Sequence, residues 1–255
     1  MRRLQALPSF RPGIAYLLDT LYLAPTARSP AAHTMRSSRG PSFDRPDAGL
    51  APLPASRTSR ALATDSGFTL LPDGTPEPSA EELAALVDEY YAAVTVDGDE
   101  LGSMGEMDSG VVIQGEGDPL EAITVVLETI RLVAERRNGI AFRLNTLGLC
   151  DDATLDILLA ADVTAKGDAD LRRSSRLASL SVFLPAVEPT KYSELLAPQN
   201  GRGFSDVCTF ISRAAEAGVD VECTAVARPD VNISDIKRLA MALGARSFRT
   251  RSWLG

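Results

Sequence analysis

Two glycines and two acids follow a short apolar run in the segment Val111-Val-Ile-Gln-Gly-Glu-Gly-Asp-Pro-Leu120. Gly115 and Gly117 carry no Cβ, so the backbone there can approach a bound molecule closely. Glu116 offers a carboxylate to an ammonium group, and Asp118 stands directly before a proline. The spacing is neither GxGxxG nor a Walker loop, which disfavours a phosphate site at this turn. We expect a site for an amino-acid-like ligand; the alternative is a plain strand-to-helix turn with a solvated Glu116.

Three more polar residues lie at the end of, or within, later apolar runs. Asn145 ends one run, whereas Ser181 and Thr224 lie inside the next two. If these runs are strands of one parallel sheet, their carboxyl ends meet at one edge, where ligands collect. Asn145 can bond ribose or carboxylate oxygens from a strand end, although an Asn shortly before a glycine is equally typical of a turn. Ser181 and Thr224 lie within their strands and face the interior of a barrel if the alternation allows.

No nucleophile and base can be paired with conviction. The sole histidine, His33, lies in a stretch rich in Pro, Ser and Arg, where a solvated role is the simplest interpretation. Cys150 follows the same run as Asn145, but a small buried thiol is the more usual role of such a residue. The three cysteines are widely spaced and form no CxxC pair, so neither a disulfide framework nor a metal site is indicated.

Capping signals and apolar periodicity predict alternating strands and helices from about residue 79. Ser79-Ala-Glu-Glu82 and Asp118-Pro-Leu-Glu121 are both capping boxes ahead of apolar stripes with helical spacing. The predicted strands are 14–23, 111–113, 140–144, 177–184, 219–226 and 245–250. This order predicts an α/β fold with parallel strands and right-handed crossovers. A partial or full β/α barrel and an open doubly wound sheet both satisfy it.

Charge divides the chain into two unlike parts. Residues 1–60 contain nine arginines and three aspartates, within a chain of net charge −8. We therefore expect residues 1–78 to be an Arg/Pro/Ser-rich, poorly ordered segment containing a first strand at 14–23, and residues 79–255 to form the barrel body. The acidic body disfavours a nucleic-acid partner, and the apolar runs are too short for a membrane span.

We expect a small-molecule ligand and a cytoplasmic protein. An organellar alternative rests on the Arg- and Ser-rich beginning of the sequence. The sequence identifies no protein partner.

The chain resembles the radical SAM superfamily, and within it the radical SAM proteins associated with TatD-type nucleases. The resemblance covers roughly residues 14–253 and is carried by three stretches: 111–120, 140–148 and 222–231. It implies a partial (β/α)6 barrel in which the turn from Gly115 to Pro119 holds the amino group of S-adenosylmethionine. Glu116 is then the carboxylate, with Asp118 as a competitor.

The same resemblance assigns further contacts with S-adenosylmethionine. Asn145 and Ser181 correspond to polar strand residues near the ribose and the carboxylate of the cofactor. The backbone from Thr224 to Val226 corresponds to the place where the adenine packs.

One motif of this family is missing. The family has CxxxCxxC after its first strand to hold a 4Fe-4S cluster, and here Ser29, His33 and Arg36 occupy the three cysteine positions. Thiolates are the ligands that hold such a cluster, so we expect no cluster and no reductive radical chemistry.

Two functions are therefore expected from the sequence. The first is a radical SAM-like pseudoenzyme with a degenerate iron-sulfur site that retains binding of S-adenosylmethionine or a nucleoside, with its substrate unknown. The second is a cluster-free barrel enzyme in which Glu116 and Asp118 carry out acid/base chemistry, with Cys150 as a further candidate. A third reading is that residues 1–78 reflect a wrong exon or start and that the true sequence carries the cysteines.

Overall fold

The structure is a computed structural model that describes residues 11, 13–17, 20–33, 71–72, 74–94, 110–161 and 176–253. Its seven strands are β1 (Ala15–Leu17), β2 (Leu21–Leu23), β3 (Val111–Ile113), β4 (Ala141–Thr146), β5 (Arg176–Phe183), β6 (Val221–Ala227) and β7 (Ser247–Ser252). The described helices are α2 (Ala80–Val94), α3 (Ile123–Arg136), α4 (Asp152–Ala160), α5 (Pro189–Leu196), α6 (Phe204–Glu216) and α7 (Ile233–Ala242), with the 3-10 turn η3 (Pro119–Ala122) before α3.

The strands form one sheet in the order β1-β2-β3-β4-β5-β6-β7. Strands β2 to β7 are parallel to their neighbours, whereas β1 is antiparallel to β2. Because parallel neighbours follow one another in sequence order, the sheet has the topology of a β/α barrel and not that of a doubly wound fold. The expected α/β fold with parallel strands is confirmed.

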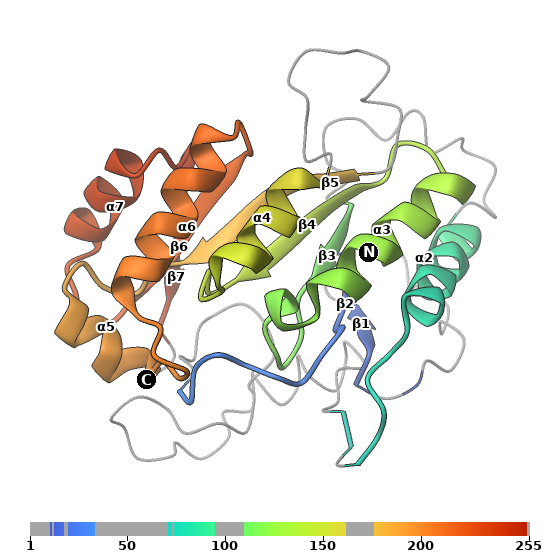
Figure 1. Ribbon diagram of the computed structural model, residues 1–255, viewed down its shortest axis with the longest axis horizontal. Coiled ribbons are helices and arrows are strands. Elements are labelled where there is room, and N and C mark those ends of the chain that lie inside the picture. Colours follow the sequence, from blue (N-terminus) through green and yellow to red (C-terminus); the bar gives the residue numbers. More distant parts are fainter. Residues whose placement is uncertain are drawn as a thin grey trace.

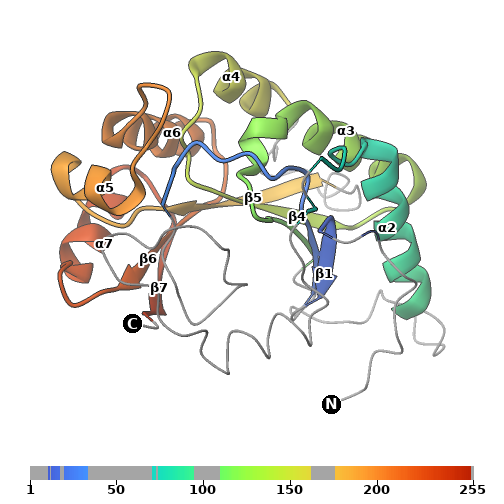
Figure 2. The same cartoon turned by 90° about the horizontal axis from the view of Figure 1, so that it is seen from below.

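The sheet is an open arch. Figure 2 shows β1 and β7 at its two ends, with the helices on the outer side. No pairing joins β1 to β7 among the described residues, so the arch is a partial barrel. Figure 1 shows the same elements from the helix side, with β4 and β5 at the centre.

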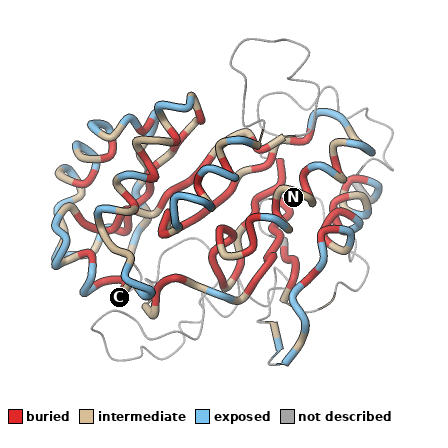
Figure 3. Tube along the Cα trace, viewed as in Figure 1, coloured by how far each residue is buried: buried red, intermediate tan, exposed pale blue. Residues whose placement is uncertain are grey.

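The core lies between the sheet and the helices. Alternate strand residues point to the helices and are fully buried. Figure 3 shows how much of the central strands is buried. Examples are Leu21, Ile113, Leu144 and Val182, each no more than 1% exposed. The intervening residues point to the inner side of the arch, where several of them are polar.

The prediction of a single first strand at 14–23 was wrong. The chain reverses between Leu17 and Leu21, so β1 and β2 form an antiparallel pair in which Tyr16 lies opposite Tyr22. The two rings stack with their centroids 4.9 Å apart. This pair adds one strand to the six that the apolar runs indicate.

The predicted helix signals agree with the structure. Ser79 Oγ accepts a hydrogen bond from the Glu82 N–H at 3.2 Å, which begins α2, and Asp118 caps η3. Gly139, Gly218 and Gly244 follow α3, α6 and α7 with positive φ angles, as helix ends require. The predicted division of the chain at residue 78 stays a prediction, and residues 34–70 lie outside the described part. Among the described residues, no helix combines the length and apolarity needed to cross a bilayer.

Candidate functional site

Residues 24–33, which we call the strap, cross the carboxyl ends of the strands from β2 to α5 (Figure 1). The strap is fastened at its far end by backbone hydrogen bonds from Ala32 to the Ala197 carbonyl, 3.1 Å, and from His33 to the Leu196 carbonyl, 3.0 Å. It therefore lies over the edge at which a ligand of a β/α fold would be expected.

The two glycines of the turn after β3 make room for the strap. A Cβ at Gly115 would lie 2.3 Å from the Ala24 Cβ, and a Cβ at Gly117 would lie 2.3 Å from the Arg28 carbonyl oxygen. The Gly117 N–H donates to the Thr26 carbonyl at 3.1 Å. The space that the missing Cβ atoms leave is thus filled by the chain itself, and a contact of either glycine with a ligand stays a prediction.

An ion pair holds the middle of the strap. Arg28 places its Nε and Nη2 each 3.1 Å from the two carboxylate oxygens of Glu77, and Thr26 Oγ1 donates to the same carboxylate. Burial raises the pKa of Glu77, but the hydrogen bonds from Arg28 and Thr26 outweigh it, so the pKa lies below its usual value. The strap is therefore fixed to the chain before α2 as well as to the turn after β3.

Asp118 lies in a cage of donors at the ends of β3 and β4. Its Oδ1 accepts from the Leu120 N–H at 3.0 Å, its Oδ2 from the Leu147 N–H at 2.6 Å, and both oxygens from Thr146 Oγ1 at 2.8 and 2.9 Å. Burial raises the pKa of this carboxyl, against the effect of these hydrogen bonds. Asp118 is 4% exposed, and its role in the structure is to join two strand ends. Glu116, two residues earlier, is half-buried.

The predicted strand residues lie together on the inner face of the arch. Asn145 and Ser181 are opposite one another in the register of β4 and β5, and Ser181 is opposite Glu222 of β6. Ser181 Oγ donates to Glu222 Oε1 at 3.4 Å. Thr224, two residues after Glu222, points to the same face and is 3% exposed. The structure thus brings Asn145, Ser181 and Thr224 onto one face of neighbouring strands, and their role in binding stays a prediction.

Among the side chains of Asn145, Ser181 and Thr224, one buried atom lacks a hydrogen-bond partner. Asn145 Nδ2 donates to Gln114 Oε1, while the buried Asn145 Oδ1 accepts no hydrogen bond. Asn145 is only 8% exposed, and a buried acceptor without a donor is costly unless a ligand or water supplies one. Gln114, which directly follows β3 and precedes the glycine turn, is therefore a further candidate site residue.

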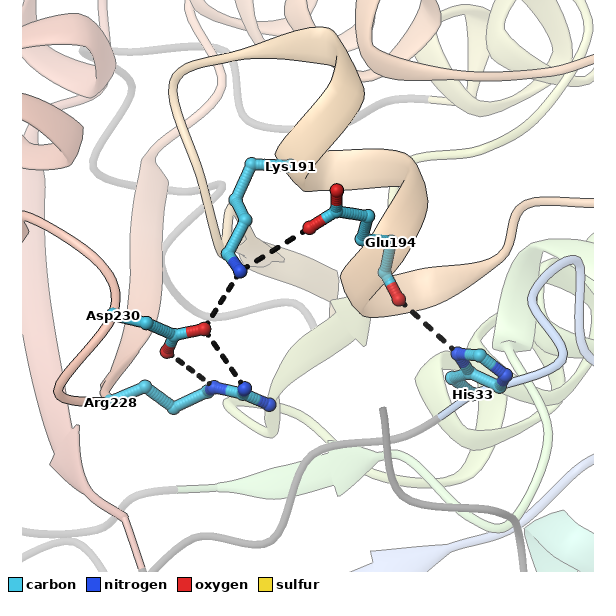
Figure 4. Close-up of polar contacts among 5 residues, drawn as sticks. All are labelled: His33, Lys191, Glu194, Arg228 and Asp230. Carbon is cyan, nitrogen blue, oxygen red and sulfur yellow. Dashed lines mark hydrogen bonds and ion pairs between the residues drawn. The ribbon is translucent and has the colours of Figure 1, made fainter. Parts of the chain in front are cut away.

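The residues at the cysteine positions of the family motif have other contacts. Ser29 Oγ donates to the Ala31 carbonyl at 3.1 Å and accepts from the Ala31 N–H at 3.3 Å. His33 Nδ1 lies 3.4 Å from the Glu194 carbonyl oxygen at the end of α5, as Figure 4 shows. Arg36 lies outside the described residues. In the part of the chain that is described, no group of three His, Cys, Asp or Glu residues could hold a metal ion.

The three cysteines of the chain lie outside the strap. Cys223 is buried on the helix side of β6, and Cys208 lies on α6 behind the sheet. Cys150 borders a small cavity of about 160 Å³ between α4 and α6, together with Asp206 and Phe210. Burial raises the pKa of Cys150 and of Cys223 to about 12. Neither thiol has the properties of a nucleophile.

Near His33, charged residues of α5 and of the loop after β6 form a network (Figure 4). Arg228 binds both oxygens of Asp230, at 2.8 and 3.0 Å, and Lys191 Nζ lies 2.7 Å from Asp230 Oδ2. Arg228 also lies over the ring of Trp253, 5.6 Å from its centroid. These charges balance one another, so the network is best explained as a fastening between α5 and the end of β6.

Three arginines on the inner face were missed by the sequence analysis. Arg143 of β4 and Arg249 and Arg251 of β7 alternate with residues that point to the helices. The signal was present in the sequence as Arg-Thr-Arg at the end of a predicted strand, since residues two apart in a strand share a face.

No family model matches the sequence, and no curated protein matches it. Solved structures of SuiB from Streptococcus suis are similar in fold. SuiB bound to S-adenosylmethionine is 12% identical, with a TM-score of 0.49; the match covers 73% of this chain and 36% of that one. SuiB bound to the precursor peptide SuiA is 14% identical, with a TM-score of 0.48; the match covers 70% and 34%. The chain spans about a third of the length of these SuiB chains.

Proposed function

We propose that this chain is a radical SAM-like binding protein that retains a site for S-adenosylmethionine or a related nucleoside. The observation that carries the proposal is the orphaned Asn145 Oδ1 in the row Gln114, Asn145 and Ser181. A ribose hydroxyl or an ammonium group supplies the donor that this buried oxygen lacks. The row lies at the carboxyl ends of β3 to β5, where ligands of β/α folds bind.

We further propose that the chain does not carry out reductive cleavage of S-adenosylmethionine. The donors at the three motif positions do not fit a 4Fe-4S cluster. A serine hydroxyl and an imidazole replace two thiolates, and a guanidinium, which has no lone pair to donate, replaces the third. The hydroxyl of Ser29 and the imidazole of His33 are, in addition, engaged with backbone atoms.

Isothermal titration of the full chain with S-adenosylmethionine and with adenosine tests the binding proposal. We expect saturable binding of at least one of them and an affinity about tenfold lower for Asn145→Ala, which corresponds to about 1.4 kcal/mol. Asn138→Ala is the matched control, because Asn138 is an exposed residue just before the other end of β4. Absence of binding, or equal losses in both variants, would contradict the proposal.

Anaerobic reconstitution with iron and sulfide tests the second proposal. We expect no stable four-iron species in the natural sequence. The triple variant Ser29→Cys, His33→Cys, Arg36→Cys restores the CxxxCxxC spacing and serves as a positive control, because it should bind iron if the strap has the proper course. A stable cluster in the natural sequence would show that other residues hold it.

Acid/base chemistry by Glu116 and Asp118 has no observation in its favour. Both oxygens of Asp118 are occupied by donors from η3 and from the end of β4. A carboxylate that is held in this way cannot exchange protons with a substrate unless the strand ends separate. The binding function therefore accounts better for the site.

A further inference from the structure

The strap occupies two hydrogen-bond donors of the turn after β3. The Gly117 N–H donates to the Thr26 carbonyl at 3.1 Å, and the Asp118 N–H donates to the Arg28 carbonyl at 2.8 Å. Successive backbone N–H groups in a turn are suited to bind a carboxylate, such as that of an amino-acid-like ligand. In this conformation the carbonyl groups of the strap take the place of that ligand.

A single carboxylate, which we call the latch, holds the middle of the strap. Glu77, three residues before α2, accepts hydrogen bonds from Arg28 Nε and Nη2, each at 3.1 Å, and from Thr26 Oγ1. The side chains of Arg28 and Glu77 are 57% and 35% exposed. Because solvent screens an ion pair of this exposure, the latch favours the closed strap by about fivefold at most. It can therefore be opened at low cost.

The two ends of the strap are fixed independently of Glu77. At one end the strap continues from β2. At the other end, the N–H groups of Ala32 and His33 donate to the carbonyls of Ala197 and Leu196 at 3.1 and 3.0 Å. Figure 1 shows the strap running between these two attachments. Loss of the latch therefore frees the middle of the strap and leaves both ends in place.

We propose that the strap is an autoinhibitory gate, latched by Glu77, that withholds the turn at Gly117 and Asp118 from the amino-acid part of a ligand. This inference rests on the proposed function and adds a regulation to the same site. Adenosine has no amino-acid part and needs only the row at Asn145, whereas S-adenosylmethionine needs the turn as well. Opening of the strap should therefore discriminate between the two compounds.

Isothermal titration of Glu77→Gln with both compounds tests the gate. We expect the affinity for S-adenosylmethionine to rise by about fivefold, because the latch no longer opposes opening, and the affinity for adenosine to stay unchanged. Glu82→Gln is the matched control. Glu82 also pairs with an arginine, Arg11, at 2.9 Å, and its side chain is 38% exposed, but it lies on α2 and does not bind the strap. Neither affinity should change in this control.

Thermodynamic linkage gives a second measurement, which uses the natural sequence. If opening of the strap favours binding of S-adenosylmethionine, then S-adenosylmethionine must favour opening to the same extent. Trypsin can cleave after Arg28 only when the middle of the strap leaves the turn and the latch. We expect saturating S-adenosylmethionine to speed this cleavage several-fold and adenosine to leave it unchanged, as measured by mass spectrometry of the peptides.

The gate is overturned if Glu77→Gln binds S-adenosylmethionine no more tightly than the natural sequence, or if it gains equally for adenosine. An equal gain in Glu82→Gln, or protection of the Arg28 bond by S-adenosylmethionine, also contradicts it. If neither compound binds to the natural sequence or to Glu77→Gln, the proposed function fails together with the gate. If adenosine binds and the affinity for S-adenosylmethionine does not respond to the latch, only the gate fails.

Discussion

Asp118 Oδ2 accepts a hydrogen bond from the Leu147 N–H at 2.6 Å, and this contact ties the turn after β3 to the end of β4. Thr146 extends the tie, because its Oγ1 donates to Asp118 and accepts from the Gly148 N–H at 2.9 Å. The strap is bound to the same turn, since the Asp118 N–H donates to the Arg28 carbonyl at 2.8 Å. One buried carboxyl thus organises the edge on which the proposed site lies.

We expect Asp118→Ala to lower the free energy of unfolding by about 3 kcal/mol or more, because it leaves buried donors of Leu120, Leu147 and Thr146 without an acceptor. Asp151→Ala is a matched control. Asp151 caps α4 by accepting from the Thr154 N–H at 2.8 Å, but it is exposed, so its loss should cost only about 1 kcal/mol. Urea denaturation measures both, and equal costs would mean that the cage around Asp118 is not a stabilising feature.

Gly117→Ala tests the close approach of the strap. The new Cβ would lie 2.3 Å from the Arg28 carbonyl oxygen and 2.6 Å from the Thr26 carbonyl oxygen, both backbone atoms that cannot rotate away. We expect a loss of about 3 kcal/mol in the free energy of unfolding. At Gly203 an added Cβ meets nothing within 4 Å and φ is extended, so Gly203→Ala should cost less than about 1 kcal/mol. If Gly117→Ala were as stable as Gly203→Ala, the strap would not lie against this turn.

The strands were predictable where apolar runs are buried on the helix side. The run at 111–113 matches β3 in full, and the other runs differ from their strands by a few residues at their ends. The reversal between Leu17 and Leu21 was not predictable in this way, because both β1 and β2 are apolar and only Asp19 and Thr20 interrupt them. An apolar run predicts that a segment is buried, but it does not predict whether the chain reverses direction within that segment.

The site was predictable in part. Register places Asn145, Ser181 and Thr224 on one face, and the periodicity of two in strands was sufficient to anticipate this. From the sequence, Gly115 and Gly117 are expected to contact a ligand, but the structure packs the strap against them. The strap lies about ninety residues earlier in the chain than these glycines. Such a long-range contact leaves no local pattern.

The ion pairs of Asp230 predict a specific dependence of stability on pH. Hydrogen bonds from Arg228, and then from Lys191, hold the pKa of Asp230 well below its usual range. A depressed pKa stabilises the folded state in full at pH values above the ordinary carboxyl pKa of about 3.9. This contribution declines as the pH falls below that value and is lost as the pH falls through the depressed pKa of the folded state. Because Asp230 is exposed, solvent screening keeps the contribution below about 1 kcal/mol.

A double-mutant cycle measures this contribution. We expect Asp230→Asn and Arg228→Gln to show a coupling in the free energy of unfolding at pH 7 that fades below about pH 4. Arg228→Gln also removes the contact of Arg228 with the Trp253 ring. This loss occurs both in the single and in the double variant, so it does not contribute to the coupling free energy. Strictly additive losses at pH 7 would mean that the ion pair between Arg228 and Asp230 does not stabilise the folded state.

The thiols should be unreactive in the folded protein. A pKa of about 12 for Cys150 and Cys223 leaves about one thiolate in ten thousand at pH 8, compared with about a quarter for an ordinary cysteine. We expect iodoacetamide at pH 8 to alkylate these two residues only slowly in the native state, and all three cysteines rapidly in urea. Mass spectrometry of the labelled peptides identifies each site. Rapid native labelling of Cys150 would show an activated thiol beside the cavity between α4 and α6, and would reopen a nucleophilic role for it.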